Sequence, residues 1–170
     1  GLGRKEQLEA AGVEVIADMR GVGQNLRDHP SVAVRWHAED DFPMPDVETG
    51  PQKTALRYTA KDSELRNDMI AVMRWNSPLR EFMMSAGLYL AKAAGEIRLV
   101  SNDSHQQPEL DYHLLDHPYD LERMRAGVRM QIELGKHSAY KGILKEVKDP
   151  LPEDLESDET LDKWLLSRAQ

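Results

Sequence analysis

Several stretches of the chain alternate apolar and polar side chains, the period-two pattern that is typical of β-strands with one covered face. One follows Pro30, where Val32, Val34 and Trp36 share a face. The stretch at residues 69–75 differs because apolar side chains occupy both of its faces. This pattern predicts an interior strand, covered by helices on one side and by another domain or a ligand on the other. The predicted strands cover residues 13–18, 32–37, 54–59, 69–75, 82–94, 96–100 and 109–114.

Residues 82–94 carry two conflicting signals. Their Met, Leu, Ala and Lys content favours a helix, whereas the alternation of Met84, Ala86 and Leu88 fits a strand. Gly95 then leads directly into residues 96–100, which alternate cleanly. We therefore predict two antiparallel strands joined as a hairpin at Gly95.

Two short segments have the spacing and end signals of α-helices. Residues 4–11 form a helix that Gly12 ends, and the order helix, glycine, strand is typical of α/β units. A second helix follows the N-cap Ser157. Its buried face is formed by Leu161, Trp164 and Leu165. Residues 39–52 hold three prolines and a glycine among several acids, which predicts a loop.

The longest predicted helix begins at Pro118 and ends near Lys136. Either Asp116 or His117 can cap it, and proline suits the first helical position. Its apolar stripe predicts that the helix covers the sheet. That stripe consists of Leu121, Met124, Val128 and Ile132.

Composition limits the classes of function. The chain has 170 residues and a net charge of -8, so a nucleic-acid backbone is a poor partner. It has no cysteine, which excludes disulfides and thiolate chemistry. No apolar run approaches the ~20 residues of a membrane span. These features predict a soluble, cytoplasmic protein that binds neither nucleic acid nor membrane.

The ten residues from Gly21 to Pro30, "GVGQNLRDHP", concentrate glycine, Asx and histidine in one segment. Taken alone, they predict a polar turn between two ordered segments. Asp28 beside His29 could orient a base, but no nucleophile motif accompanies the pair, so a hydrolytic triad is not supported. His113 and His117 share no helical face, and we expect no metal site.

In its wider context this segment resembles the glucose-methanol-choline (GMC) oxidoreductases, which are FAD-dependent. Gly1, Leu2 and Gly3 match the end of that family's Ser-Gly-x-Gly signature, and "GVGQNLRDHP" matches its Gly-Val-Gly-x-Asn-Leu-x-Asp-His turn. The run "PELDYHLLDHPYDLERMRAGVRM", from Pro108 to Met130, follows the family pattern further along the chain. The resemblance covers nearly the whole sequence.

The resemblance implies an α+β fold in which helices cover a mostly antiparallel sheet. Residues 1–30 would be the C-terminal edge of an FAD-binding domain, as a short α/β remnant, and residues 31–170 a substrate-binding domain. It further implies FAD contacts from Gly1, Gly3, Asn25, Leu26, Asp28 and His29. The strand at residues 69–75 would roof the flavin ring and lend Met73, Arg74 and Trp75 to the substrate pocket, although a stripe of Met and Trp is also ordinary core.

The family's catalytic histidine and its dinucleotide fingerprint both fall outside the sequence, so we assign no catalytic residue. We expect the substrate-binding part of an enzyme that oxidises a small alcohol, inactive by itself and in need of the missing FAD domain. The alternative is a non-catalytic α+β binding or interaction module without flavin. An uncovered sheet face would also favour a homo-oligomer.

Overall fold

A computed structural model describes residues 1–46, 50 and 52–170. Its main body is a five-stranded antiparallel sheet with strand order β10-β4-β7-β6-β5. The strands are β4 (Ser31–Ala38), β5 (Gln52–Tyr58), β6 (Met69–Asn76), β7 (Glu81–Leu88) and β10 (Leu144–Asp149). The predicted strands at residues 32–37, 54–59 and 69–75 are thereby confirmed, and β6 is an interior strand. The predicted loop is present at residues 39–46, and its part at residues 47–49 and 51 lies outside the described residues.

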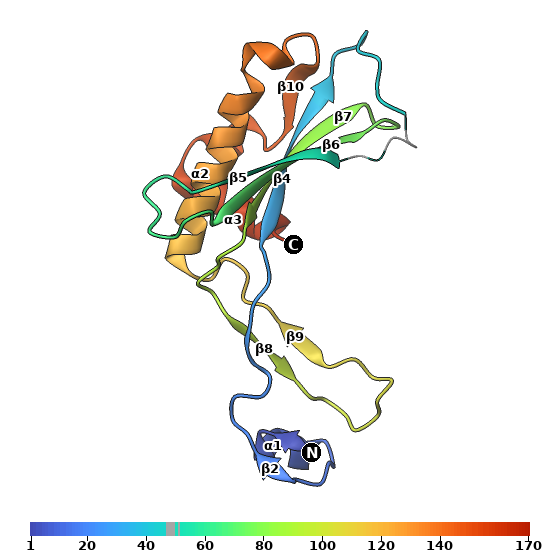
Figure 1. The fold of residues 1–170 in the computed structure, drawn as a ribbon, viewed down its shortest axis with the longest axis vertical. Helices are drawn as coiled ribbons and strands as arrows, with labels where there is room; N and C mark the ends of the chain where they lie inside the picture. The colour runs from blue at the N-terminus through green and yellow to red at the C-terminus, as the bar shows by residue number, and fades with distance from the viewer. Residues whose placement is uncertain (47–49, 51) are drawn as a thin grey trace.

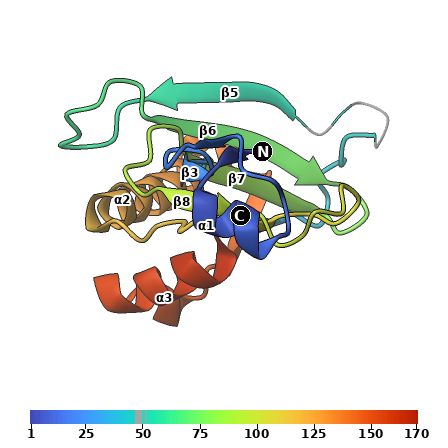
Figure 2. The ribbon, with the colours of Figure 1, turned by 90° about the horizontal axis from the view of Figure 1, so that it is seen from below.

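Two helices lie on the same side of this sheet, α2 (Pro118–Gly135) and α3 (Asp158–Arg168) (Figure 2). The caps form as the sequence predicts. His117 Nδ1 accepts a hydrogen bond from the Tyr119 amide at the start of α2, and Ser157 accepts one from the Thr160 amide at the start of α3. Met124 and Val128 of α2 are fully buried against the sheet. The core therefore occupies one face of the sheet, and no helix of the described residues covers the other, which we call the helix-free face.

The rest of the chain forms a narrower extension below the main body (Figure 1). It contains a three-stranded sheet of order β3-β8-β9, with β3 (Gln24–Leu26), β8 (Gly95–Arg98) and β9 (Glu109–Asp111). At its far end β1 (Leu2–Gly3) pairs in parallel with β2 (Ala17–Asp18), next to α1 (Lys5–Ala10). Gly12, at φ +70°, ends α1 as predicted.

The predicted hairpin at Gly95 is wrong. Strand β7 pairs with β4 and β6 in the large sheet, whereas β8 pairs with β3 and β9 in the small one. The reason lies between the two strands, where Asp120 of α2 accepts hydrogen bonds from the backbone amides of Lys92 and Ala93. Because these hydrogen bonds hold residues 92 and 93 at α2, the chain leaves the large sheet before Gly95.

Two smaller predictions also need correction, and one strand was not predicted. The strand predicted at residues 13–18 shortens to β2, and the predicted turn at residues 21–30 includes strand β3. Strand β10 lies in a segment with no strand pattern, where it pairs with β4 through two irregularities in register. Two short 3₁₀ helices flank β10, η2 (Ser138–Tyr140) and η3 (Pro152–Leu155).

Candidate functional site

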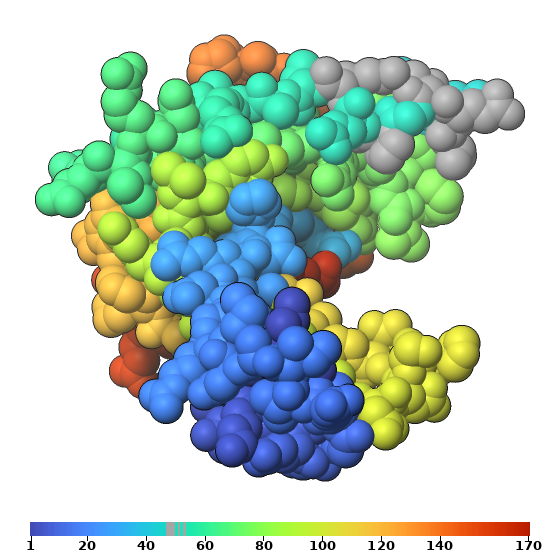
Figure 3. Space-filling view, turned by 60° about the horizontal axis from the view of Figure 1, so that its bottom comes forward, coloured from blue at the N-terminus to red at the C-terminus, as the bar shows by residue number. Residues whose placement is uncertain are grey.

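The helix-free face of the large sheet is hollowed where small side chains lie side by side. Strand pairing places Ala33 of β4 opposite Ser85 of β7, which lies opposite Val72 of β6. In the next row Gly87 lies beside Ile70, and a Cβ atom on Gly87 would stand 2.9 Å from Ile70 Cγ2. Of these residues, Ala33 and Ser85 line the floor of a cavity of about 350 Å³. In the space-filling view the molecule is hollowed between the lower extension and the main body (Figure 3).

One row of this face carries long charged side chains. Across the sheet, Arg35 of β4 and Arg74 of β6 both lie opposite Met83 of β7. The row continues to Asp149 of β10 beside Arg35 and to Gln52 of β5 beside Arg74. The row therefore has one arginine on each side of Met83, at the edge of the floor formed by the small side chains.

A buried carboxylate supports the row. Glu81 of β7 is 1% exposed, and it is bonded by Lys148 through Oε1. Arg35 Nη1 lies 3.5 Å from Glu81 Oε2, an oxygen that accepts no hydrogen bond within the described part of the chain. Burying a carboxylate is costly unless such cationic partners lie beside it. Glu81 thus positions Arg35 and has a cationic partner beside each of its two oxygens.

The segment after α3 closes the cavity at the edge of the sheet. The Ser31 amide donates to the Gln170 carbonyl, and the Gln170 amide donates to the Ser31 carbonyl. Gln170 therefore pairs with the first residue of β4. Arg168 Nε then lies 3.6 Å from Asp149 Oδ2, while Trp164 Nε1 donates to Asp149 Oδ1 at 2.9 Å. Arg168 becomes a third arginine beside the cavity.

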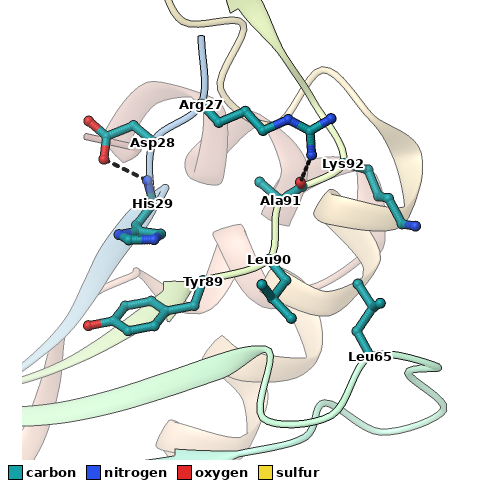
Figure 4. Close-up of a pocket in the computed structure, with 8 residues that line it drawn as sticks. All are labelled: Arg27, Asp28, His29, Leu65, Tyr89, Leu90, Ala91 and Lys92. Atoms are coloured by element: carbon teal, nitrogen blue, oxygen red, sulfur yellow. Dashed lines mark hydrogen bonds between the residues drawn. The ribbon is translucent and has the colours of Figure 1, made fainter. Parts of the chain in front are cut away.

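A second cavity, of about 310 Å³, lies where the extension joins the main body (Figure 4). The rings of His29 and Tyr89 stack there with centroids 4.3 Å apart, and the Arg57 guanidinium lies 4.3 Å from the Tyr89 ring centroid. Asp28 Oδ1 accepts the His29 amide at 2.7 Å, and Arg27 donates to the Ala91 carbonyl. This stack fixes the orientation of the segment that leads into β4.

The residues expected to contact the cofactor do not form one cluster. Asp28 and His29 line the cavity of Figure 4. Asn25, at φ +59°, and Leu26 lie in β3, where Leu26 pairs with Gly95. Gly1 and Gly3 lie at the far end of the extension, where their missing side chains leave room for Leu8. These positions give the glycines a packing role, and their role toward a cofactor stays a prediction.

The three residues expected in the substrate pocket divide between the two faces of β6. Arg74 lies on the helix-free face and lines the larger cavity. Met73 and Trp75 pack against the core on the helix side. The sequence did not point to Arg35, Met83 or Ser85, because only the strand register brings them beside Arg74.

Two further expectations concern absences. Among the described residues, no group of three or more His, Cys, Asp or Glu side chains is placed to hold a metal ion. No helix in the same part of the chain has the length and apolar character to cross a bilayer.

Comparison with known proteins confirms the resemblance that the sequence motifs indicate. Residues 91–169 match the family model described as GMC oxidoreductase. An uncharacterised GMC-type oxidoreductase of Rhodococcus erythropolis is 28% identical over 175 residues, covering 99% of this chain and 32% of that protein. The choline oxidase of Arthrobacter globiformis is 28% identical over 153 residues, covering 82% of this chain and 28% of that protein.

Solved structures share the fold. Pyridoxine 4-oxidase from Mesorbium loti superimposes with a TM-score of 0.86 at 18% identity, over 98% of this chain and 35% of that one. A formate oxidase of Aspergillus oryzae RIB40, whose structure concerns FAD modification, superimposes with a TM-score of 0.82 at 19% identity. The match covers 99% of this chain and 39% of the formate oxidase. The α+β fold with a mostly antiparallel sheet is confirmed. The chain spans about a third of the length of the curated relatives it matches.

Proposed function

We propose that this chain is the substrate-binding portion of a longer FAD-dependent GMC oxidoreductase that oxidises a small alcohol. The observation that carries the proposal is the match of residues 91–169 to the GMC oxidoreductase model, on a sheet whose helix-free face is hollow. Within the proposal, residues 1–30 are the edge of the FAD-binding domain and residues 31–170 the substrate-binding domain. The chain by itself is then inactive.

The helix-free face suits a flat cofactor ring. Ala33 and Ser85 give the cavity a floor of short side chains, and Gly87 keeps the neighbouring part of the face low, because a larger side chain there would meet Ile70. A planar group can approach such a surface closely and exclude water from it. When bound, FAD supplies the acceptor for the hydride that leaves the alcohol carbon.

The residues of this chain then bind and orient. In the proposal, Gly1, Gly3, Asn25 and Leu26 contact FAD along the lower extension. Asp28 and His29 contact FAD where the extension joins the main body. The ring stack of His29 with Tyr89 holds this segment in place. Arg74 lies on the face that meets the substrate.

A protein extended at both ends with its adjoining coding sequence tests this function. After reconstitution with FAD it should show flavin absorbance in the visible range, and it should bleach when a small alcohol is added without oxygen. A matched preparation of the 170-residue chain should retain no flavin. An extended protein that stays colourless after reconstitution would contradict the proposal and favour a non-catalytic binding module.

The exposed sheet face also motivates a proposal about assembly. An uncovered face with partly apolar side chains such as Ile70 and Met83 favours self-association when no other domain covers it. We expect the 170-residue chain to associate and the extended, FAD-bound protein to do so less, measured by sedimentation velocity. Equal association of both proteins would contradict this explanation.

A further inference from the structure

We propose that the cavity on the helix-free face binds the carboxylate of an anionic alcohol substrate, with Arg74 as its main partner. This inference rests on the proposed function, since it names the class of alcohol that the same face would receive. It comes from the ionic partners of the arginines around the cavity.

Two of the three arginines at the cavity are already paired with carboxylates. Arg35 lies beside the buried Glu81, which Lys148 also bonds. Arg168 lies beside Asp149, which is also held by the indole of Trp164. The two carboxylates are therefore engaged by three cations and one neutral donor.

Arg74 is the exception. Within the described residues it forms no hydrogen bond or ion pair, and its side chain is exposed. The cavity thus has more positive than negative charges, although the chain as a whole has a net charge of -8. A local excess of positive charge in a cavity attracts an anion, even when the net charge of the protein is negative.

The strand register places Arg74 and Arg35 on the same row of the cavity, one on each side of Met83. Both lie opposite Met83, so their Cα atoms are two strand spacings apart, roughly 10 Å. Side chains as long as arginine can converge over the intervening methionine. Guanidinium groups recognise carboxylates by paired, charge-assisted hydrogen bonds. The cavity of about 350 Å³ lies within the size range of small-molecule sites.

The same arrangement disfavours a cationic alcohol such as choline. A quaternary ammonium needs a free carboxylate or an aromatic surface. Glu81 is buried and doubly engaged, and Asp149 is held by Arg168 and Trp164. The aromatic Trp75 packs on the opposite, helix-covered side of the sheet.

Calorimetric titration of the full-length, FAD-reconstituted protein tests the proposal without requiring turnover. The probes are para-(hydroxymethyl)benzoate, its neutral methyl ester, and choline. We expect the carboxylate to bind at least tenfold more tightly than the ester. Arg74→Gln should weaken the carboxylate by roughly 10- to 100-fold, the range for one charged hydrogen-bonded pair, and leave the ester unchanged.

Two further variants control for charge and for geometry. Arg66→Gln removes the same charge from an exposed position in the loop between β5 and β6, where no ionic contact is formed with other described residues, and should change nothing. Arg74→Lys keeps the charge but loses the planar pair of donors, so it should recover only part of the affinity.

Three results would overturn the proposal. The first is equal affinity for the carboxylate and the ester, and the second is tighter binding of choline. The third is an Arg74→Gln variant that loses FAD or stability but keeps its ligand preference, which would mean that Arg74 pairs with an acidic group elsewhere in the parent. Failure of the proposed function would look different, as a protein without flavin or turnover whose ligand preference is still measurable.

Discussion

Arg123→Met in α2 should destabilise the fold strongly. Arg123 is 1% exposed and bridges two fully buried carboxylates, Asp68 at 2.8 Å and Asp120 at 2.6 Å. Its guanidinium also donates to the carbonyls of Leu90 and Tyr119. The cluster joins α2 to the residue that precedes β6 and to the segment where the chain leaves the large sheet.

The cost of the substitution follows from this burial. Removing the cation leaves two carboxylates in the interior without their charged partner, and breaking a buried pair in this way costs about 3–5 kcal/mol. With a urea dependence of ~2 kcal/mol/M for a chain of this size, the unfolding midpoint falls by roughly 1.5–2.5 M. Arg129→Met is the control, because it makes the same change on the same helix at a half-exposed pair with Asp158. It should move the midpoint little.

The pH dependence separates this explanation from simple loss of packing. Burial favours a raised pKa of Asp68, but hydrogen bonds from Arg123, Ser63 and the Ala60 amide outweigh it and lower the pKa below 3.8. In the wild type this stabilisation is present above pH 3.8 and is lost as the pH falls through the lowered value. In Arg123→Met burial acts with fewer opposing bonds, so the pKa of Asp68 rises. The stability deficit should therefore shrink as the pH is lowered from 7 towards 4, followed by urea unfolding. A deficit that is independent of pH, or equal in Arg129→Met, would refute the reasoning.

Two other substitutions test the core. Burial, with the charge of Asp68, raises the pKa of Tyr58 to about 12, and the Tyr58 hydroxyl has no hydrogen-bond partner among the described residues. The wild type should lose stability as the pH rises above 10, because the phenol of the unfolded chain ionises before that of the folded chain. Tyr58→Phe should remove this loss and stabilise the fold by about 1 kcal/mol at pH 7. A Tyr58→Phe protein whose alkaline unfolding curve matches that of the wild type would contradict this prediction. Met124→Ala should cost about 2–5 kcal/mol because Met124 is fully buried, whereas Met130→Ala, half-buried on the same helix, should cost less than half as much in urea unfolding.

The large sheet could be predicted because its strands carry their own signal. Val32, Val34 and Trp36 alternate with polar residues and are all buried in β4. The helix caps could likewise be predicted, since His117 and Ser157 both accept hydrogen bonds from the expected backbone amides. In each case neighbouring residues determine the structure, so a local pattern is sufficient.

The failures occur where distant residues decide the local structure. Residues 89–94 leave the sheet because the Asp120 side chain holds the amides of Lys92 and Ala93, which no local pattern records. Strand β10 has mostly charged residues, and it forms because Val147 pairs opposite Trp36 at the sheet edge. Strand β3 depends on Gly23, whose carbonyl accepts the Ile97 amide at 2.6 Å.

The site shows the same division. The apolar side chains on both faces of residues 69–75 predict an interior strand, whereas Arg74 is named as a pocket residue only through the family resemblance. Its partners Arg35 and Met83 come from strands far apart in sequence and are aligned only by the register of the sheet. The interior strand can be predicted from the sequence, but the row of residues across the strands cannot.

The proposed function requires the hollow, helix-free face of the sheet to receive the cofactor and the substrate. Its most direct test is the flavin content of the full-length protein carrying Ser85→Trp, which places a large ring on the floor of the cavity. The control is Ser138→Trp, which makes the same change at an exposed position in η2, just beyond the C-terminus of α2. We expect Ser85→Trp to lose most of its FAD and turnover with an unchanged circular dichroism spectrum, while Ser138→Trp retains both. A Ser85→Trp protein that holds FAD and oxidises its alcohol as well as the wild type would contradict the account.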